Sequence, residues 1–113
     1  MSAVYRTEAL LRKGLSDPID LRTVATREGI SEYALIRAFR RCYAITPIQH
    51  LISLRTERAC GLLAAGELPA DAAQEAGFAD QAHLTRAFKQ RMGTTPAAYR
   101  KMVHVKGNEG PLQ

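Results

Sequence analysis

Apolar residues in the middle and near the end of the chain recur at the three- and four-residue spacing that gathers side chains on one face of a helix. This pattern covers residues 32–43 and returns over residues 81–92. It predicts two amphipathic helices, each packed against the rest of the chain through its apolar face. The residues that we expect in the core are Leu35, Ala38, Phe39 and Cys42 in the first helix, and Leu84, Ala87 and Phe88 in the second.

Capping residues divide the rest of the sequence into further helices, about seven in all. Asp20, Ser31 and Asp80 have the short polar side chains that cap a helix N-terminus. Thr46-Pro47 and Thr95-Pro96 each supply a cap followed by proline at the first helical position, and glycines close most of the helices. The predicted helices span residues 2–14, 21–28, 32–43, 47–65, 69–76, 81–92 and 96–102, with a turn at 16–18 and a flexible C-terminal tail over 103–113.

One segment of the chain repeats another. Leu84-Thr85-Arg86-Ala87-Phe88-Lys89 carries the same Leu-x-Arg-Ala-Phe-basic pattern as Leu35-Ile36-Arg37-Ala38-Phe39-Arg40, 49 residues upstream, and both continue to a Thr-Pro pair. An alanine-containing segment that ends in glycine precedes each copy at an offset of 48, so the second copy holds one extra residue. The shared order of residues indicates an internal duplication. Each copy is a helix, a glycine-containing turn and a second helix, which is a helix-turn-helix.

The sequence therefore predicts an all-α fold with two helix-turn-helix lobes in a domain over residues 1–102. The lobes cover about residues 3–46 and 67–102, and a long linker helix covers about residues 47–65. This linker has apolar residues near both ends and the polar segment Arg55–Arg58 between them. We expect it to be buried at its ends and solvated in the middle.

The charge of the chain points to a polyanionic partner. The 113 residues suit one domain or two very small lobes, and they carry a formal net charge of +5. Residues 31–58 hold five arginines against two glutamates, and residues 80–101 hold five basic residues against one aspartate. This distribution favours nucleic acid. No apolar run is long enough to span a membrane, and Cys42 and Cys60 lack metal-ligand spacing, so we expect a cytoplasmic protein with reduced thiols.

Polar and basic side chains lie opposite the apolar face in the second helix of each repeat. Arginine can fork onto a guanine edge, glutamine and threonine offer shorter hydrogen bonds to bases, and a helix N-terminus favours phosphate. Exposed basic residues are usually just solvated, but matched basic positions in two copies strengthen the interpretation as DNA contacts. The candidate residues are Tyr33, Ile36, Arg37 and Arg40 in the first copy, and Gln81, Ala82, Thr85, Arg86 and Lys89 in the second.

Two aromatic positions near these helices have competing interpretations. Tyr33 either stacks on a sugar or covers the turn, and His83 is expected to pack or cap rather than contact a base.

Neither His50 nor His104 has a carboxylate or cysteine at ligand spacing. No nucleophile–base signature or glycine-rich phosphate loop occurs. We therefore expect that the protein is not an enzyme and that it binds neither a metal nor a cofactor.

Gly77 to Lys89, followed by Gly93-Thr94-Thr95-Pro96-Ala97-Ala98-Tyr99-Arg100, resembles the signature of the AraC/XylS family of bacterial transcription regulators. The resemblance covers roughly residues 5–101. It implies an all-helical domain in which the second helix of each helix-turn-helix enters a major groove. The base-reading positions that the resemblance implies are Tyr33, Ile36 and Arg37, and Gln81, Ala82, Thr85 and Arg86. Two departures stand out: Ile36 and Ala82 are apolar, and Ala44 stands where the second copy has Gly93.

The resemblance implies double-stranded DNA as the partner and sequence-specific regulation of transcription as the function. RNA polymerase and an effector-binding or dimerisation domain are further partners that it suggests. Most members carry such a domain ahead of this one, and this chain is either a stand-alone member or an excised DNA-binding domain. The alternative function is a helical protein-interaction module that does not bind DNA.

The length of the linker helix leads to a prediction about the DNA site. Its 19 residues make it about 28 Å long at a rise of about 1.5 Å per residue. This is close to one turn of B-DNA, about 34 Å. We therefore predict that a monomer binds a non-palindromic site whose two contacted segments lie about 10 base pairs apart.

Overall fold

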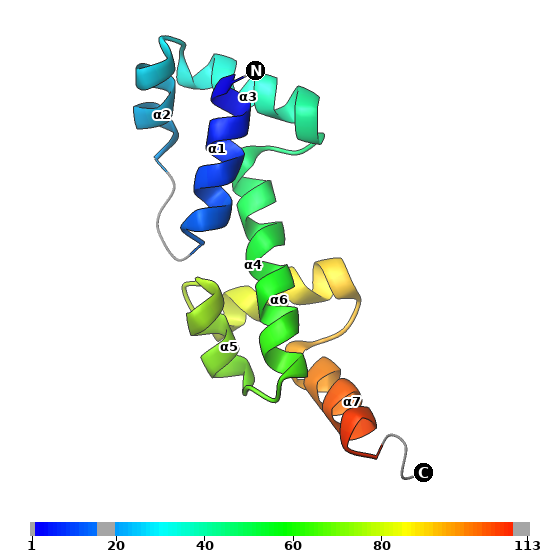
Figure 1. Cartoon of the computed structure of the whole chain (residues 1–113). Coiled ribbons are helices and arrows are strands. Elements are labelled where there is room, and N and C mark those ends of the chain that lie inside the picture. The colour runs from blue at the N-terminus through cyan, green and yellow to red at the C-terminus, as the bar shows by residue number, and fades with distance from the viewer. Residues whose placement is uncertain (1, 16–19, 110–113) are drawn as a thin grey trace. The chain divides into compact units, whose positions relative to one another are not determined.

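The structure is a computed structural model of the chain and describes residues 2–15 and 20–109. The described residues form seven helices and no strand, which confirms the predicted all-α fold (Figure 1). The predicted turn at residues 16–18 lies outside the described residues. The helices are α1 (Ser2–Lys13), α2 (Leu21–Glu28), α3 (Glu32–Tyr43), α4 (Pro47–Ala64), α5 (Pro69–Ala76), α6 (Gln81–Met92) and α7 (Pro96–Glu109).

The chain divides into two compact units, residues 1–54 and 55–113, and the division falls within α4. The first unit contains the helix-turn-helix formed by α2 and α3, and the second contains the one formed by α5 and α6. Each unit therefore includes one copy of the repeat and part of α4.

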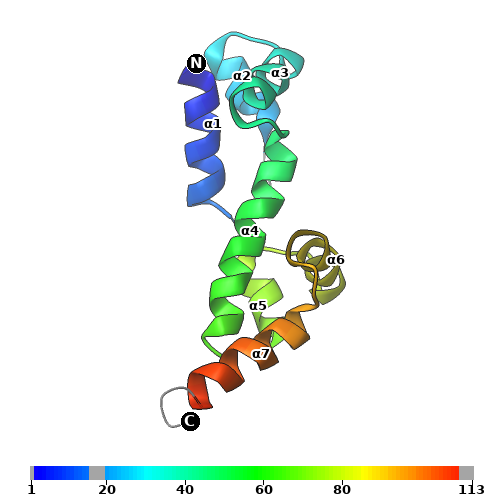
Figure 2. The same cartoon turned by 90° about the vertical axis from the view of Figure 1, so that its right-hand side faces the viewer.

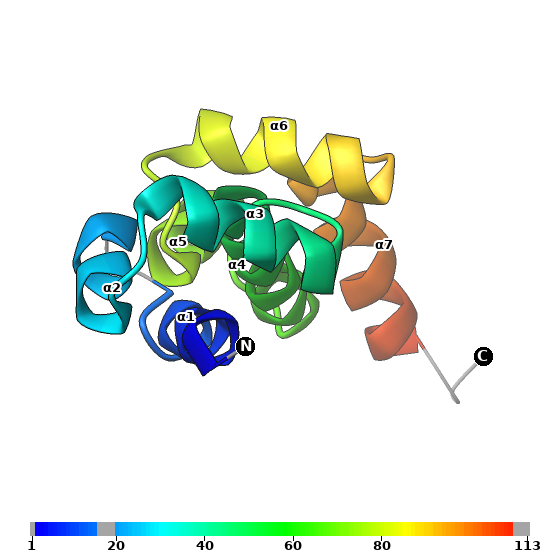
Figure 3. The ribbon, with the colours of Figure 1, turned by 90° about the horizontal axis from the view of Figure 1, so that it is seen from above.

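The first unit is built around α3, which packs against both α1 and α2 (Figure 3). Leu35 and Phe39 on α3 have no exposed surface, as their spacing predicts. Leu35 joins a cluster with Ala3, Leu21 and Ala25. Phe39 joins a second cluster with Val4, Leu11, Leu51 and Leu54, which connects α1 to the first half of α4.

The second unit repeats this plan, and α6 contacts both α5 and α7 (Figure 2). Leu84 and Phe88 are completely buried, and the Phe88 ring meets the edge of the Tyr99 ring at a centroid distance of 5.3 Å. Phe78, in the turn between α5 and α6, is also buried. The alanines of α5 let this helix lie close to its neighbours, and its buried residues are Ala72, Ala73 and Ala76.

Local capping fixes where the helices begin. The side chains of Asp20, Ser31 and Asp80 each accept a hydrogen bond from the backbone N–H three residues later. Thr46 and Gln49 cap each other reciprocally, with distances of 2.9 and 3.2 Å, which forms a capping box at the start of α4. These caps were predicted from residue type, and the bounds of α2, α3, α5 and α6 agree with the prediction.

The turn is where the two repeats differ. Both α2 and α5 end in a glycine with positive φ, Gly29 at 72° and Gly77 at 96°. At each, the glycine and the next residue donate backbone hydrogen bonds to the last turn of the helix, which is the Schellman pattern. Between this glycine and the cap of the next helix lies one residue in the first repeat, Ile30, and two residues in the second, Phe78 and Ala79. The extra residue of the second copy therefore lies in its turn.

Some predictions about burial and helix length are corrected by the structure. Cys42 is exposed because Tyr43, one turn after Phe39, takes the packing position against the Phe39 ring at 4.7 Å. The middle of α4 is only partly solvated. Glu57 and Arg58 are exposed, but Thr56 is 1% exposed, since it shares a helical face with the buried Ala59, and burial lowers the pKa of the Arg55 guanidinium.

The last helix is longer than predicted. It runs through Glu109, whereas we expected it to end near Met102 and to be followed by a tail over 103–113. A glycine inside a helix costs only about 1 kcal/mol, so Gly107 does not stop it. Conversely, α4 ends at Ala64, one residue before the predicted end, and Gly66 follows with φ of 105°.

Candidate nucleic-acid interface

The outward face of α3 presents a solvent-facing surface of aromatic and basic residues. Tyr33 is 69% exposed, and Arg37 and Arg40 are also exposed. Ile36, which we predicted to face outward with them, is only half exposed and packs against the cluster that contains Leu35. The outward face of α3 is therefore more polar and more basic than the sequence suggested.

Arg37 lies between two neighbours on the same face of α3. Its guanidinium carbon is 5.5 Å from the centroid of the Tyr33 ring, one turn earlier. One turn later, Arg41 is exposed, and the two arginines line a shallow hollow together with Ala34 and Ala38. Arg41 was not among the predicted site residues, although its spacing of four from Arg37 places it on the same face.

The outward face of α6 carries the matching residues of the second copy. Gln81, Ala82, Arg86 and Lys89 are exposed, and Thr85 is half exposed. His83 is half buried and meets the edge of the Phe78 ring at 5.1 Å, which agrees with a packing role rather than an outward one. The structure therefore exposes Arg86 and Lys89 on α6 as it exposes Arg37 and Arg40 on α3.

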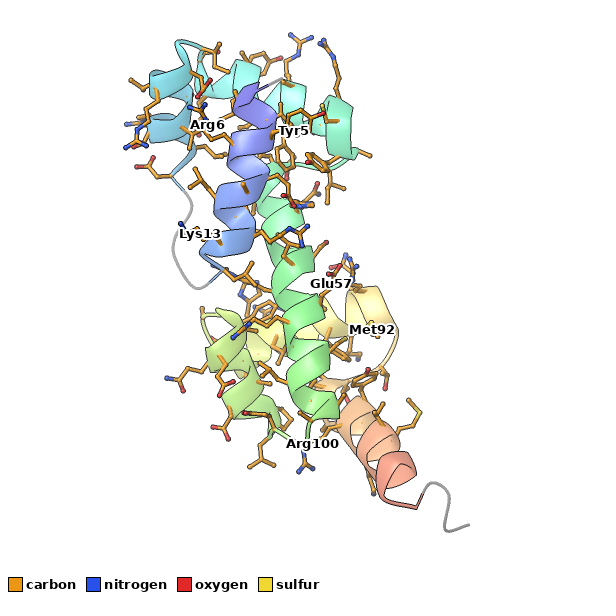
Figure 4. The ribbon with its side chains drawn as sticks, in the orientation of Figure 1. Tyr5, Arg6, Lys13, Glu57, Met92 and Arg100 are labelled. Atoms are coloured by element: carbon orange, nitrogen blue, oxygen red, sulfur yellow. The ribbon has the colours of Figure 1, made fainter. Side chains whose placement is uncertain are left out.

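Several other basic residues are engaged by acceptors within the protein. Arg6 on α1 bonds to Glu28 at 2.7 Å, and Arg12 bonds to Glu8 at 2.6 Å. In the second unit, Glu57 lies on α4 (Figure 4), and its carboxylate accepts a bond from Arg91 at 3.0 Å. The Nε atoms of Arg58 and Arg100 donate to the backbone oxygens of Glu75 and Gly66 at 3.3 and 3.1 Å. These bonds tie the cations to the scaffold.

The basic residues on the outward faces of α3 and α6 differ from these. Within residues 2–15 and 20–109, none of them forms an ion pair with a carboxylate. They are also exposed, so their positive charge creates a potential at the helix surface that attracts anions. These uncompensated cations are Arg37, Arg40 and Arg41 on α3, and Arg86 and Lys89 on α6.

Two helix N-termini add to the positive potential. The first backbone N–H groups of α3 and α6 are only partly satisfied by their Ser31 and Asp80 caps. Free N–H groups and the helix dipole favour an anion at this end. Each helix start also carries one carboxylate, Glu32 in the first turn of α3 and the cap Asp80 before α6, so the two N-termini are similar in charge.

The described residues offer neither a metal site nor a membrane-spanning helix. No group of three or more His, Cys, Asp or Glu side chains in the described part of the chain could hold a metal ion. Cys42 and Cys60 are free thiols, and burial raises the pKa of Cys60. Among the described residues, no helix is both long enough and apolar enough to cross a membrane.

Comparison with known proteins identifies relatives of the chain. The family model for a helix-turn-helix domain matches residues 24–102. The MmsAB operon regulatory protein of Pseudomonas aeruginosa is 31% identical over 96 residues, which are 84% of this chain and 31% of that protein. The uncharacterized HTH-type transcriptional regulator YbfI of Bacillus subtilis is 36% identical over 74 residues, 66% of this chain and 27% of that protein. The chain thus spans about a third of the length of these curated relatives.

Solved structures show the same fold. The DNA-binding domain of the global transcriptional factor AdpA, solved in complex with a target DNA, is 28% identical with a TM-score of 0.83, and the match covers 95% of this chain and 97% of that one. The C-terminal domain of AraT, a response regulator from Geobacillus stearothermophilus, is 31% identical with a TM-score of 0.80 and coverage of 90% and 86%. Since the family model spans most of the sequence and the repeats fold as two helix-turn-helix motifs, the chain belongs to the AraC-type helix-turn-helix family.

Proposed function

We propose that this chain is the sequence-specific DNA-binding part of a transcription regulator, and that α3 and α6 each contact a major groove. The observation that carries the proposal is the set of exposed basic residues on these two helices, which have no carboxylate partner among the described residues. The AdpA domain, solved with its target DNA, supports the same role. No observation favours the alternative of a protein-interaction module.

The residues on each helix suit different parts of the DNA. Arg37 and Arg86 lie in the middle of their helices, where a side chain reaches a base edge, and arginine can bind the O6 and N7 atoms of guanine together. Arg40 and Lys89 lie one turn later and suit phosphate contacts, which position the protein without reading the sequence. Gln81 at the start of α6 can bind an adenine edge.

Selection of binding sites from a random DNA pool tests this function, followed by affinity measurements on the selected site. Arg37→Ala and Arg86→Ala should each weaken binding by about 1–3 kcal/mol if the side chain reaches a base. Arg6→Ala is the matched control. It removes the same charge, but from a residue bonded to Glu28 on another face, so we expect little change in affinity.

The salt dependence of binding separates base contacts from phosphate contacts. Loss of a phosphate contact weakens binding to all sequences alike and reduces the salt slope by about 1. Loss of a base contact weakens binding mainly to the selected site. Failure of the wild-type chain to select any sequence, or unchanged affinity in both arginine variants, would contradict the proposed function.

The spacing of the site remains a prediction of the sequence. We expect one chain to bind a non-palindromic site with two contacted segments about 10 base pairs apart. Inserting about 5 base pairs between the segments moves one of them to the other side of the duplex, and binding should then fall towards the non-specific level. A palindromic site bound by two chains would contradict this model. RNA polymerase and an effector-binding or dimerisation domain stay predictions of the resemblance.

A further inference from the structure

Tyr33 and Arg37 form a pair on the exposed face of α3. The guanidinium carbon of Arg37 lies over the Tyr33 ring, 5.5 Å from its centroid, and the tyrosine is 69% exposed. Residues four apart are neighbours on a helix surface. Long side chains on a helix also lean towards its N-terminus, so Arg37 leans over the turn that carries Tyr33. The pair is therefore a consequence of the sequence spacing and of helix geometry.

The other neighbours of Arg37 favour this position of the side chain. Arg41, one turn later, carries the same charge, and like charges at this spacing repel each other. Glu32 belongs to α3 but lines a different hollow, beside Asp20 and Arg22 at the start of α2. Within the described part of the chain, no carboxylate forms an ion pair with Arg37. The ring of Tyr33 thus attracts the guanidinium without an ion pair drawing it away.

The second repeat lacks this pair. Arg86 on α6 corresponds to Arg37, and the residue four positions before it is Ala82, which corresponds to Tyr33. Both arginines are exposed, and both stand in the same Leu-x-Arg-Ala-Phe pattern. The chain therefore contains the same arginine twice, once with an aromatic neighbour on the preceding turn and once without.

We propose that Tyr33 is a positioning residue that holds Arg37 ready for DNA contact, while Arg86 has no such support. This inference rests on the proposed function. A free arginine side chain must lose rotamer freedom when it binds, and that loss weakens affinity. Contact with the Tyr33 ring restricts Arg37 before binding and leaves the N–H groups at the edge of the guanidinium free to donate to a base or phosphate.

A double-mutant cycle on the selected DNA site measures this role directly. Tyr33→Ala should weaken binding about two- to fivefold, the equivalent of an exposed cation–π contact. In the Arg37→Ala background the same change should have no effect, because there is no guanidinium left to position. Tyr33→Phe keeps the ring and should restore wild-type affinity. The exposure of Tyr33 makes these changes compatible with folding, and circular dichroism checks that each variant is folded.

Arg86→Ala provides the matched control. Combined with Tyr33→Ala, its effect on affinity should simply add, since the two residues belong to different helix-turn-helix motifs. A non-additive result for this control pair would overturn the inference, because Tyr33 would then act through the fold as a whole.

The outcomes distinguish the inference from the proposed function. A wild-type chain that selects no DNA sequence overturns the function and the inference together. Equal losses from Tyr33→Ala with and without Arg37 show that the tyrosine contacts DNA itself, and overturn the inference alone. No loss from Tyr33→Ala in a chain that still binds its site also overturns the inference alone.

Discussion

Ala44 ends α3 in a conformation that favours glycine. Its φ is 70° and its ψ is −6°, and it is the only non-glycine residue with positive φ among those described. Its N–H donates to the Arg40 oxygen at 2.8 Å, as the N–H of Gly93 donates to the Lys89 oxygen at 2.9 Å at the end of α6. The helix ends in the same way in both repeats, although the first repeat has no glycine there.

Replacing Ala44 with glycine should therefore stabilise the first unit. An L-residue in the left-handed region costs about 1–2 kcal/mol, and glycine loses about 0.5–1 kcal/mol more conformational entropy on folding. The difference leaves a gain of about 0.5–1 kcal/mol in the free energy of unfolding. The reverse change, Gly93→Ala, should cost a similar amount, because a methyl group there meets nothing within 4 Å and only the backbone is strained.

Urea denaturation followed through the amide signals of α3 and of α6 measures the two units separately. Ala44→Gly should raise the midpoint for α3, and Gly93→Ala should lower it for α6. Ala34→Gly is the control: it makes the same chemical change at an exposed position in the first turn of α3, and should destabilise α3 by roughly 0.5–1 kcal/mol. Destabilisation by Ala44→Gly as large as that of the control would refute the strain argument.

Further predictions concern the core, α4 and acid stability. Phe39→Ala and Phe88→Ala should each cost about 3–5 kcal/mol, because both rings are fully buried, and unchanged urea midpoints would show that they do not hold the core. Gly61→Ala should stabilise α4 by about 0.5–1 kcal/mol, since a methyl group meets nothing there, and a lower midpoint would contradict this. A hydrogen bond from Arg12 lowers the pKa of Glu8 below its ordinary 4.5. The ionised Glu8 side chain therefore adds its full contribution to the free energy of unfolding above pH 4.5, and this contribution is lost as the pH falls through the lowered pKa. Acid titration of Glu8→Gln should show a weaker loss of stability below pH 4.5 than wild type, and an identical loss would exclude this role.

Local sequence signals were sufficient for most of the fold. A short polar residue before a helix or a glycine after it acts within a few residues of the chain, so the caps at Ser31 and Asp80 and the turn at Gly29 could be predicted without knowledge of the neighbours. The end of α7 was predicted wrongly because the sequence from Met102 to Glu109 contains no strong local stop signal. No proline occurs between Pro96 and Glu109, and Gly107 alone does not end a helix.

Positions that depend on tertiary neighbours were harder to predict. Spacing shows which way a side chain points, but it does not show what lies opposite. Cys42 was predicted to be buried but is exposed, because Tyr43 packs against Phe39 instead. Ile36 was predicted to face outward but packs against the Leu35 cluster. Thr56 lies in a polar segment of the sequence, so its burial on the same helical face as Ala59 could not be predicted from residue type.

The candidate site followed the same division. The repeat identified Arg37 and Arg86, but which cations lack a carboxylate partner depends on contacts between helices. Arg91 is the clear example, because its partner Glu57 lies on α4, far away in the sequence. The spacing of four between Tyr33 and Arg37 is enough to place the two side chains side by side on α3. The structure adds the distance between the guanidinium and the ring.

Changing every base pair of the selected DNA site, one at a time, against wild type, Arg37→Ala and Arg86→Ala tests the central claim most directly. If α3 and α6 each read their own segment, Arg37→Ala should abolish the discrimination between bases at positions in one segment, and Arg86→Ala should do so in the other. Each lost preference should be worth about 1–3 kcal/mol. Loss at the same positions in both variants, or full discrimination in both, would contradict the account.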